Sequence, residues 1–410
     1  MKVFKLWTNM SLIKRICIGL AVGIILSLTL GNTVSFLAIF GKLFVGALRA
    51  IAPILVFVLV ISAICHHEGG KKTEMKGFLL LSVVGMVSAG IIGVTISFII
   101  PTEVSLVGVA ASDISPPAGI TEVLLNILMN IIDNPVRALS NANYIGILTW
   151  AVIIGLALKG AADSTKEVIH DLSEAITQGV RWVISFAPFG IMGLVYSSIM
   201  ESGMEVFLSY GELIGVLVAT MLITTLVLIP LISFIVMRQN PYPLVFRALK
   251  DSGITAFFTR SSAANIPVNL ALAAKLNFNK DMYSVAIPLG ATINMAGAAV
   301  TISVLTMATA HTVGIQVDFL SALLLVLLAT ISACGASGVA GGSLLLIPLA
   351  CSLFGIPGEI SAQVVAIGFI IGVVQDSCET ALNSHSDIVY LGTLRGRKLR
   401  QEGKRLVLAK

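Results

Sequence analysis

The chain is organised around long apolar runs, each about as long as a helix must be to cross a lipid bilayer. Such a helix needs about 20 apolar residues, and runs of this kind recur along all 410 residues. Only 11% of the residues are charged and 57% are hydrophobic, whereas a soluble domain has about 25% charged residues. These features exclude an ordinary soluble enzyme, a disordered tail and a nucleic-acid binder. They predict an all-α polytopic membrane protein.

The apolar runs predict eight transmembrane spans. Seven are clear, at 16–30, 43–64, 78–100, 183–200, 213–237, 283–308 and 364–391. The fourth in chain order is a broken apolar region at 119–158, interrupted around Asp133, Pro135 and Arg137. The first run resembles a secretory signal, but no small-x-small cleavage pattern follows it, so we expect a retained span.

Charge placement predicts the orientation of these spans. The net charge is +5, and the basic residues gather in alternate short loops and at both ends. The loops between them carry acidic residues without Lys or Arg. By the positive-inside rule, both termini are expected in the cytoplasm. The five cysteines are odd in number and lie mostly in apolar runs, so they predict neither a disulfide framework nor a metal-binding pattern.

Two further apolar stretches, 244–274 and 319–353, do not fit simple spans. If the first crossed the bilayer, Lys275 and Lys280 would lie outside, against the charge bias. Both contain small polar segments, 259–267 and 332–343, whose exposed backbone groups are tolerated at membrane depth only when buried or lining a cavity. We expect two re-entrant hairpins, each followed by a span that contains polar residues, as in inverted-repeat transporters. Two kinked ordinary helices remain the alternative.

The strongest local signal lies in the last span. Asp376, Thr380, Asn383 and Asp387 are spaced so that they share one narrow face of a helix, with Glu379 at its margin. An unpaired aspartate at a helix centre costs at least about 2.5 kcal/mol in a membrane. These carboxylates therefore need cations, from ions, from a substrate amine or from Arg260. The alternative is a purely structural pairing with basic residues between helices.

Two weaker signals accompany this polar face. The segment 290–297 places Asn and Thr between glycines, which loosens a helix and frees carbonyls to bind a hard cation such as sodium; close helix packing through small residues is the alternative. N–H groups that converge at half-helix N-termini in the hairpin tips suit a carboxylate. Together with the acidic face they predict a zwitterion site, with the carboxylate at the tips and the amine at Asp376.

At these residues the sequence resembles the dicarboxylate/amino acid:cation symporter family, which includes archaeal aspartate and mammalian glutamate transporters. Four motifs carry the resemblance, which is tightest over 238–394: the serine-rich segment 259–267, the Asn-Met-x-Gly break at 294–297, the glycine-rich segment 332–343, and Asp-x-x-x-Thr-x-x-Asn-x-x-x-Asp at 376–387. Within the family the chain looks most like the bacterial serine/threonine:sodium symporters.

The resemblance implies the archaeal aspartate transporter fold, with eight spans and two re-entrant hairpins. Residues 1–243 would mainly form scaffold and trimerisation spans, some of them moving with the transport domain. Residues 244–394 would form the transport core, and 395–410 a basic cytoplasmic tail. The resemblance further implies a homotrimer, elevator-type alternating access and a place in the bacterial cytoplasmic membrane.

The family's site roles transfer to matching positions. Asp376 would bind the substrate amine with Thr380 and the backbone near Val339, and Asn383 and the backbone of Ser262 would hold the α-carboxylate. One sodium site would use Asp387 with carbonyls of Gly290, Asn294 and Asn383. Another would use Thr292, Met295 and carbonyls of the second hairpin.

Three departures from the family pattern bear on the substrate and on the coupled ions. Acidic-substrate members have an arginine where this chain has Glu379 and a hydroxyl where it has Ala298. Glu379 would repel an acidic substrate by about 3 kcal/mol, for charges about 5 Å apart at an effective dielectric constant of about 20, and Arg260 is a candidate partner to screen it. We therefore expect a small neutral hydroxy amino acid, L-serine or L-threonine. Ala296 replaces an aspartate of a third sodium site, so fewer coupled sodium ions are expected.

Other functions fit the sequence less well. Gly335-Ala336-Ser337-Gly338 matches a pattern of intramembrane serine proteases, in which the serine needs a histidine within hydrogen-bond reach. His385, however, lies about 180° from Asp376 on the last helix and points away from the polar face. No histidine cluster predicts a metal enzyme, and a site closed by two hairpins disfavours a channel. Within transport, the rivals are acidic amino acids or C4-dicarboxylates as substrates, and protons as the coupling ion.

Overall fold

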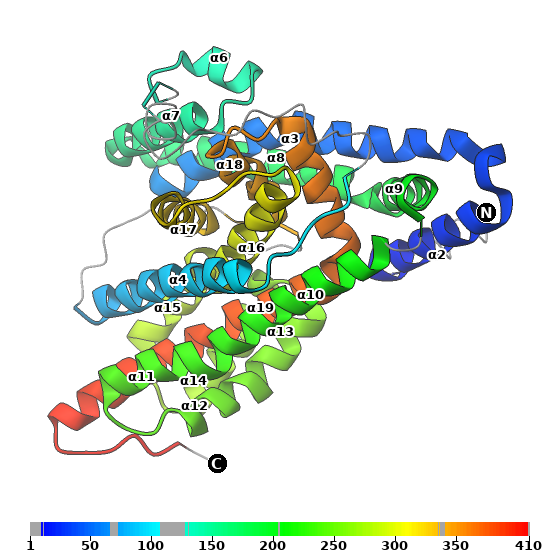
Figure 1. The fold of residues 1–410 in the computed structure, drawn as a ribbon. Coiled ribbons are helices and arrows are strands. Elements are labelled where there is room, and N and C mark those ends of the chain that lie inside the picture. Colours follow the sequence, from blue (N-terminus) through cyan, green and yellow to red (C-terminus); the bar gives the residue numbers. More distant parts are fainter. Residues whose placement is uncertain are drawn as a thin grey trace.

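A computed structural model describes residues 10, 12–65, 73–106, 128–129, 131–203, 206–334, 336 and 341–408. Within these residues the backbone forms helices joined by turns, with no strand (Figure 1). A helix satisfies its backbone hydrogen bonds internally, which apolar surroundings require. The prediction of an all-α chain is confirmed for the described residues.

Five helical stretches of the described chain are long and apolar enough to cross a membrane, or six if one bent pair of helices counts as a span. The first of these stretches, Lys14–Ser62, covers the first predicted span and most of the second, joined by a short 3-10 segment (Gly31–Leu37). The predicted number of eight therefore stays a prediction. The helices of this first part of the chain are α2 (Leu12–Leu30), α3 (Ala38–Cys65), α4 (Thr73–Ile99), α6 (Pro135–Ser140) and α7 (Tyr144–Ala157).

The helices α2 and α3 both pack against α9 (Ala187–Ser202) through glycines. A Cβ atom at Gly19 would collide with the backbone of Pro188, and one at Gly23 with the backbone of Met192. A Cβ atom at Gly193 would collide with the backbone at Gly41. Small residues are what allow helices to approach this closely in a membrane.

The predicted span at 183–200 falls mostly on α9, and its first residues belong to the helix before it. The chain forms α8 (Asp163–Ser185) and α9, which meet at an angle of 49°. Pro188 lies in the first turn of α9. Because proline lacks an N–H group and its ring clashes with the preceding turn, a helix through this position is broken.

The predicted span at 213–237 is one long helix in the structure. It consists of α10 (Val206–Ile223), a widened π turn (Thr224–Leu228) and α11 (Ile229–Met237). After a short turn, the segment predicted as the first hairpin forms α12 (Tyr242–Ala248), a second π turn (Leu249–Gly253), α13 (Ile254–Thr259) and α14 (Ser262–Lys275). That it enters and leaves on one side of a membrane stays a prediction. Arg260 makes the turn in the left-handed conformation, with φ of 51°, and the Ser261 hydroxyl caps α14 by accepting the Ala264 N–H.

The expected loosening at 290–297 is a complete break. The helix α15 (Lys280–Ile293) ends before Asn294 and Met295, and α16 (Ala296–Thr312) begins after them. The second hairpin contains α17 (Phe319–Ala333), a 3-10 turn (Leu344–Leu346) and α18 (Ile347–Ser352). Much of its predicted tip, at 335 and 337–340, lies outside the described residues.

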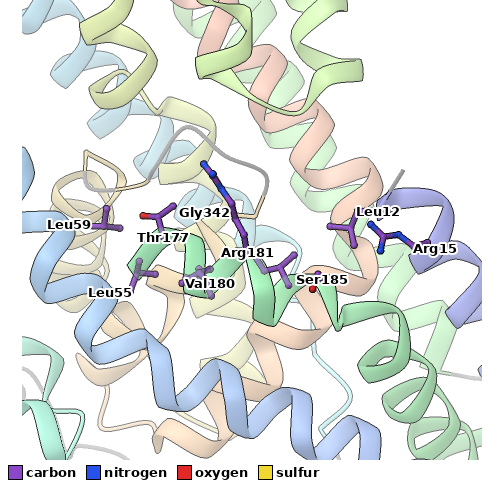
Figure 2. A pocket seen from close by; sticks show the side chains of 11 residues that line it. Leu12, Arg15, Leu55, Leu59, Thr177, Val180, Arg181, Ser185 and Gly342 are labelled. Atoms are coloured by element: carbon purple, nitrogen blue, oxygen red, sulfur yellow. The ribbon is translucent and has the colours of Figure 1, made fainter. Parts of the chain in front are cut away.

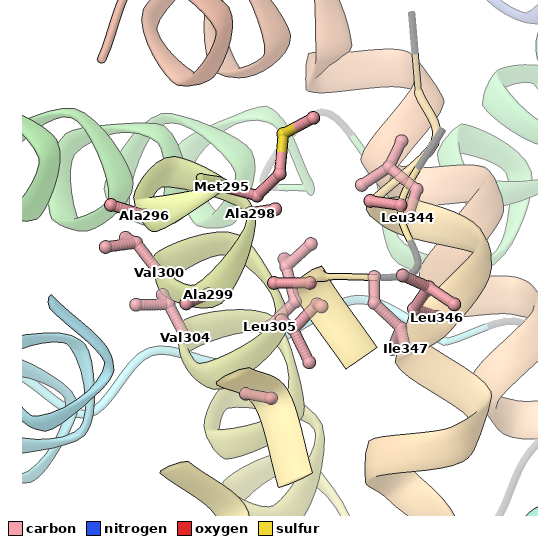
Figure 3. Packing of buried hydrophobic residues seen from close by; sticks show 14 of the residues in the cluster. Met295, Ala296, Ala298, Ala299, Val300, Val304, Leu305, Leu344, Leu346 and Ile347 are labelled. Carbon is pink, nitrogen blue, oxygen red and sulfur yellow. The ribbon is translucent and has the colours of Figure 1, made fainter. Parts of the chain in front are cut away.

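An apolar cluster fixes the second hairpin against α16. Figure 3 shows Leu305 of α16 on the side of Leu344, Leu346 and Ile347, whereas Val300 and Val304 lie on the opposite side of this helix. All of these side chains are almost fully buried. The small residues Ala296, Ala298 and Ala299 at the start of α16 are fully buried as well. This packing sets the position of the segment 341–343 that precedes the 3-10 turn.

The last helix, α19 (Gly358–Gln401), is continuous over 44 residues in spite of its polar stretch. It packs against α16, α13 and α11 and runs, orange to red, to the C-terminus in Figure 1. After it, the tail returns to the turn that follows α11, where the Gln239 amide exchanges hydrogen bonds of 2.7 and 3.1 Å with the Leu406 backbone. The basic tail and Arg238 thus lie at the same end of the molecule.

Candidate functional site

The predicted polar face of α19 is buried within the protein. Asp376, Thr380, Asn383 and Asp387 are each at most 5% exposed. They face the start of α16, the turn of the first hairpin and the segment 341–343 of the second. Buried polar groups are retained only when hydrogen-bonded or paired, so their partners define what this face can do.

Asp376 forms an ion pair with the first hairpin. Its Oδ2 atom lies 2.7 Å from Arg260 Nε, and its Oδ1 atom accepts the Gly341 N–H at 3.2 Å. The expectation that Arg260 screens Glu379 is therefore wrong. The turn at Arg260 directs the guanidinium to Asp376, and Glu379 is satisfied by other groups. Thr380 lies one turn further and donates its hydroxyl to the Asp376 carbonyl at 2.7 Å.

Glu379 is bound by three uncharged donors. Its Oε2 atom accepts hydrogen bonds from Thr301 Oγ1 at 2.6 Å, Ser343 Oγ at 2.8 Å and Gln375 Nε2 at 2.6 Å. Sequence reasoning missed all three donors. Only Gln375, four residues before Glu379 on the same helix, carried a signal in its spacing. Thr301 and Ser343 are brought there by long-range packing.

The break between α15 and α16 brings together one predicted sodium site. Asn294 Nδ2 donates to Asp387 Oδ1 and to Ser386 Oγ, both at 2.8 Å. A Cβ atom at Gly290 would collide with Asp387 Oδ1, so this glycine lets the helix approach the carboxylate. Asn294 Oδ1 is buried without a hydrogen-bond partner. Carboxylate, amide and carbonyl oxygens of this kind suit a hard cation.

Asn383 connects the two parts of this polar face. Its Oδ1 atom accepts the Gly297 N–H at the start of α16 at 2.7 Å, and its carbonyl accepts the Ser386 hydroxyl at 2.8 Å. The amide oxygen is thus engaged by α16. The NH₂ group remains as the donor that a substrate carboxylate requires.

The residues of the second predicted sodium site share fewer contacts than those of the first. The Thr292 hydroxyl is exposed and donates to the Leu289 carbonyl of its own helix at 2.8 Å. The Met295 N–H donates to Met86 Sδ at 3.4 Å. The second hairpin reaches this region through Cys334 Sγ, 3.8 Å from the Ile293 carbonyl.

The remaining candidates divide into described and undescribed residues. Ser262 is buried in the first turn of α14. Val339, predicted near the substrate amine, and Ser337, the serine of the protease alternative, lie outside the described residues. His385 is fully buried, and its Nδ1 atom is 3.0 Å from the Ala381 carbonyl of the same helix. In the part of the chain that the structure describes, no cluster of three or more His, Cys, Asp or Glu side chains fits a metal ion.

A cavity of about 310 Å³ lies between the second hairpin and the helices α2, α3 and α8. Figure 2 shows Leu55 and Leu59 of α3 with Thr177, Val180 and Arg181 of α8 along this cavity. Gly342 and Leu345 also line it, whereas their neighbours Gly341 and Ser343 bind the carboxylates of α19. The segment 341–345 thus has the cavity on one side and the two carboxylates on the other.

Comparison with known proteins decides the class of this site. The model of the sodium:dicarboxylate symporter family matches residues 12–394. The chain belongs to this family. The sodium:dicarboxylate symporter family consists of membrane transporters that couple the uptake of dicarboxylates or amino acids to a cation, and they are not enzymes. The match gives no support to the protease alternative.

Proposed function

We propose that this family member is a secondary active transporter that imports small neutral hydroxy amino acids, L-serine and L-threonine, by sodium symport. The observation that carries the proposal is the buried glutamate, Glu379, one turn after Asp376 on α19. A carboxylate at this position disfavours an acidic substrate and offers an acceptor to a hydroxyl group. Its three donors are all neutral, so its charge is not cancelled by a basic side chain.

The bound amino acid would replace protein contacts with its own groups. Its amine would take the place of the Arg260 guanidinium at Asp376, with Thr380 and the backbone near Val339 as further partners. Its carboxylate would bind to the NH₂ group of Asn383 and the backbone of Ser262. Its side-chain hydroxyl would donate to Glu379.

Sodium would bind at the break between α15 and α16. Asp387 would supply the charge, with the carbonyls of Gly290, Asn294 and Asn383 as neutral ligands. A second ion would use Thr292, Met295 and carbonyls of the second hairpin. A third is not expected, because the side chain of Ala296 offers no oxygen and the N–H of its neighbour Met295 faces the thioether of Met86, a soft group that suits sodium poorly.

The same proposal includes the assembly and the orientation. Residues 244–394 would move as a transport core by an elevator-type motion, against a scaffold from 1–243, in a homotrimer in the bacterial cytoplasmic membrane. Both termini would be cytoplasmic, with the tail 395–410. The contact between Gln239 and Leu406 supports this orientation, because it gathers basic residues at one end. At the opposite end of α4 and α16, the Val104 N–H donates to Thr312 Oγ1 at 2.8 Å, next to the acidic Glu103.

Uptake of radiolabelled L-serine into proteoliposomes tests the function. With an inward sodium gradient we expect accumulation that is lost when choline replaces sodium, and that unlabelled threonine blocks but aspartate does not. Sodium-driven aspartate uptake without serine uptake would overturn the role of Glu379. Serine uptake driven by a proton gradient without sodium would overturn the coupling ion.

A further inference from the structure

In the part of the chain that the structure describes, Glu379 is held through one of its two carboxylate oxygens. The three hydrogen bonds from Thr301, Ser343 and Gln375 all end at Oε2. Among the described residues, no hydrogen bond reaches Oε1. An ionised carboxylate has about four acceptor positions over its two oxygens. The unused capacity of this side chain is therefore concentrated on Oε1.

Two of the three donors, Gln375 and Thr301, form a closed triangle of hydrogen bonds with Glu379. The Gln375 amide donates one N–H to Glu379 at 2.6 Å and the other to Thr301 Oγ1 at 2.8 Å. The Thr301 hydroxyl accepts this bond and donates its own O–H to Glu379 Oε2 at 2.6 Å. Every donor and acceptor role in this triangle is thus fixed. Thr301 and Gln375 are fully buried, and Ser343 is nearly so, so water does not compete for these bonds.

The network also draws on three separate elements. Thr301 lies on α16, Ser343 on the second hairpin and Gln375 on α19 itself. Bonds from three directions to one oxygen prevent the carboxylate from turning about its own axis. Preorganised groups of this kind recognise a ligand without a further cost of ordering.

We propose that Gln375, Thr301 and Ser343 are positioning residues that set the side-chain specificity of the carrier. They hold Oε2 of Glu379 and leave Oε1 as the acceptor for the hydroxyl of the bound amino acid. This inference rests on the proposed function, and it adds to it the residues that make serine preferable to alanine. A site built to bind a hydroxyl rejects the analogue that lacks it, because its own buried acceptor is then left unpaired.

The test is the ratio of the KM for L-alanine to the KM for L-serine in sodium-driven proteoliposome uptake. Thr301→Val keeps the shape of the side chain and removes the hydroxyl, and we expect the ratio to fall roughly tenfold, the value of one hydrogen bond to a charged group. Thr301→Ser restores the donor and should restore the ratio. A loss of packing alone would raise both KM values together and leave the ratio unchanged.

A control variant on α16 and a second test variant on the second hairpin complete the experiment. Thr306→Val removes another fully buried hydroxyl of α16, away from Glu379, and should not change the ratio. Ser343→Ala tests the same network from the second hairpin. If neither Thr301→Val nor Ser343→Ala lowers the ratio, the positioning role is overturned.

Glu379→Gln separates this inference from the proposed function. We expect this variant to lose the preference for serine, and Thr301→Val added to it to have no further effect. If Glu379→Gln removes the preference but the single variants of its partners do not, the inference fails and the function stands. If Glu379→Gln leaves the preference intact, or the wild type takes up no serine, the proposed function itself fails.

Discussion

The two aspartates at the ends of the polar face of α19 are equally buried but differently paired. Asp376 is 3% exposed and lies 2.7 Å from the guanidinium nitrogen of Arg260. Asp387 is 1% exposed, and in the described part of the chain its carboxylate is bound by the neutral amide of Asn294 without a basic partner. One carboxylate has a cation from the protein, and the other does not.

This difference indicates what each end of the helix requires. An uncompensated buried charge costs several kcal/mol, so a cation that arrives at Asp387 stabilises the protein strongly. At Asp376 the charge is already balanced, and an arriving amine must replace Arg260. The Asp376 end therefore suits exchange between two cations, and the Asp387 end suits capture of an ion from water. A transporter that couples a zwitterion to sodium needs both.

The largest expected effect comes from Asp376→Asn. Without the carboxylate the substrate amine has no counter-charge and Arg260 is buried alone, which costs about 3–5 kcal/mol. We expect uptake to be abolished. The control is Asp251→Asn, which breaks a half-exposed pair with Arg247 of 2.6 Å and should leave uptake near normal. Near-normal transport by Asp376→Asn would show that the amine binds elsewhere.

Adding a second cation near Asp376 should change the substrate. Glu379→Arg combined with Ala298→Thr replaces repulsion by attraction for an acidic side chain. Loss of the repulsion alone, about 3 kcal/mol, corresponds to a shift in preference of at least about a hundredfold from serine towards aspartate. Competition between the two labelled amino acids measures it. An unchanged preference would mean that Glu379 does not face the substrate side chain.

At the other end, Asp387→Asn should act on sodium. We expect the sodium concentration for half-maximal serine uptake to rise at least tenfold, because the charged ligand is lost. The melting temperature of the purified protein should rise with sodium chloride relative to choline chloride in the wild type, but not in the variant. An unchanged sodium dependence would remove Asp387 from the list of ligands.

A smaller change at the same end leaves the charge in place. Gly290→Ala puts a methyl group where Asp387 Oδ1 lies, so the carboxylate must shift away from its ligands. We expect a several-fold rise in the sodium requirement and little change in the serine to alanine preference. Gly215→Ala is the control, since a Cβ atom there meets nothing within 4 Å. Equal effects of both variants would point to helix packing instead of the ion site.

The smallest effect is expected at an aspartate that has neither burial nor an ion. Asp318 is exposed and caps α17 through the N–H groups of Leu320 and Ser321. The Ser321 hydroxyl, with these N–H groups, lowers the pKa of Asp318. Asp318→Ala should cost about 1 kcal/mol at pH 7, and Asp318→Asn much less, because asparagine also caps helices.

The contribution of this cap to the free energy of unfolding should depend on pH. Because the folded pKa is lowered, the contribution of the Asp318 charge is present above the unfolded pKa of about 3.9 and is lost as the pH falls through the folded value. Thermal unfolding at neutral and acidic pH measures it. A difference between wild type and Asp318→Ala that grows on acidification would contradict this account.

Much of the local structure follows from the sequence. The break at Asn294, the turn at Arg260 and the polar face of α19 are signalled by residues close together in the chain. The pairing of these elements is not. Arg260 and Asp376 are 116 residues apart, and Thr301 and Glu379 are 78 residues apart, so their contacts depend on how whole helices pack. Sequence spacing therefore located the carboxylates but assigned Arg260 to the wrong one.

The glycine contacts among α2, α3 and α9 have a mechanical consequence. Where backbone rests directly on backbone, no side chain lies between the helices to change rotamer, and a slide of one residue would bring a side chain against a carbonyl. These three helices must move as one piece. Where α3 meets α19, Phe44 and Phe369 touch edge to face, with ring centroids 5.9 Å apart. This contact is made by side chains, which can change rotamer, so we expect displacement within the molecule to be easier along that surface than within the glycine-packed corner.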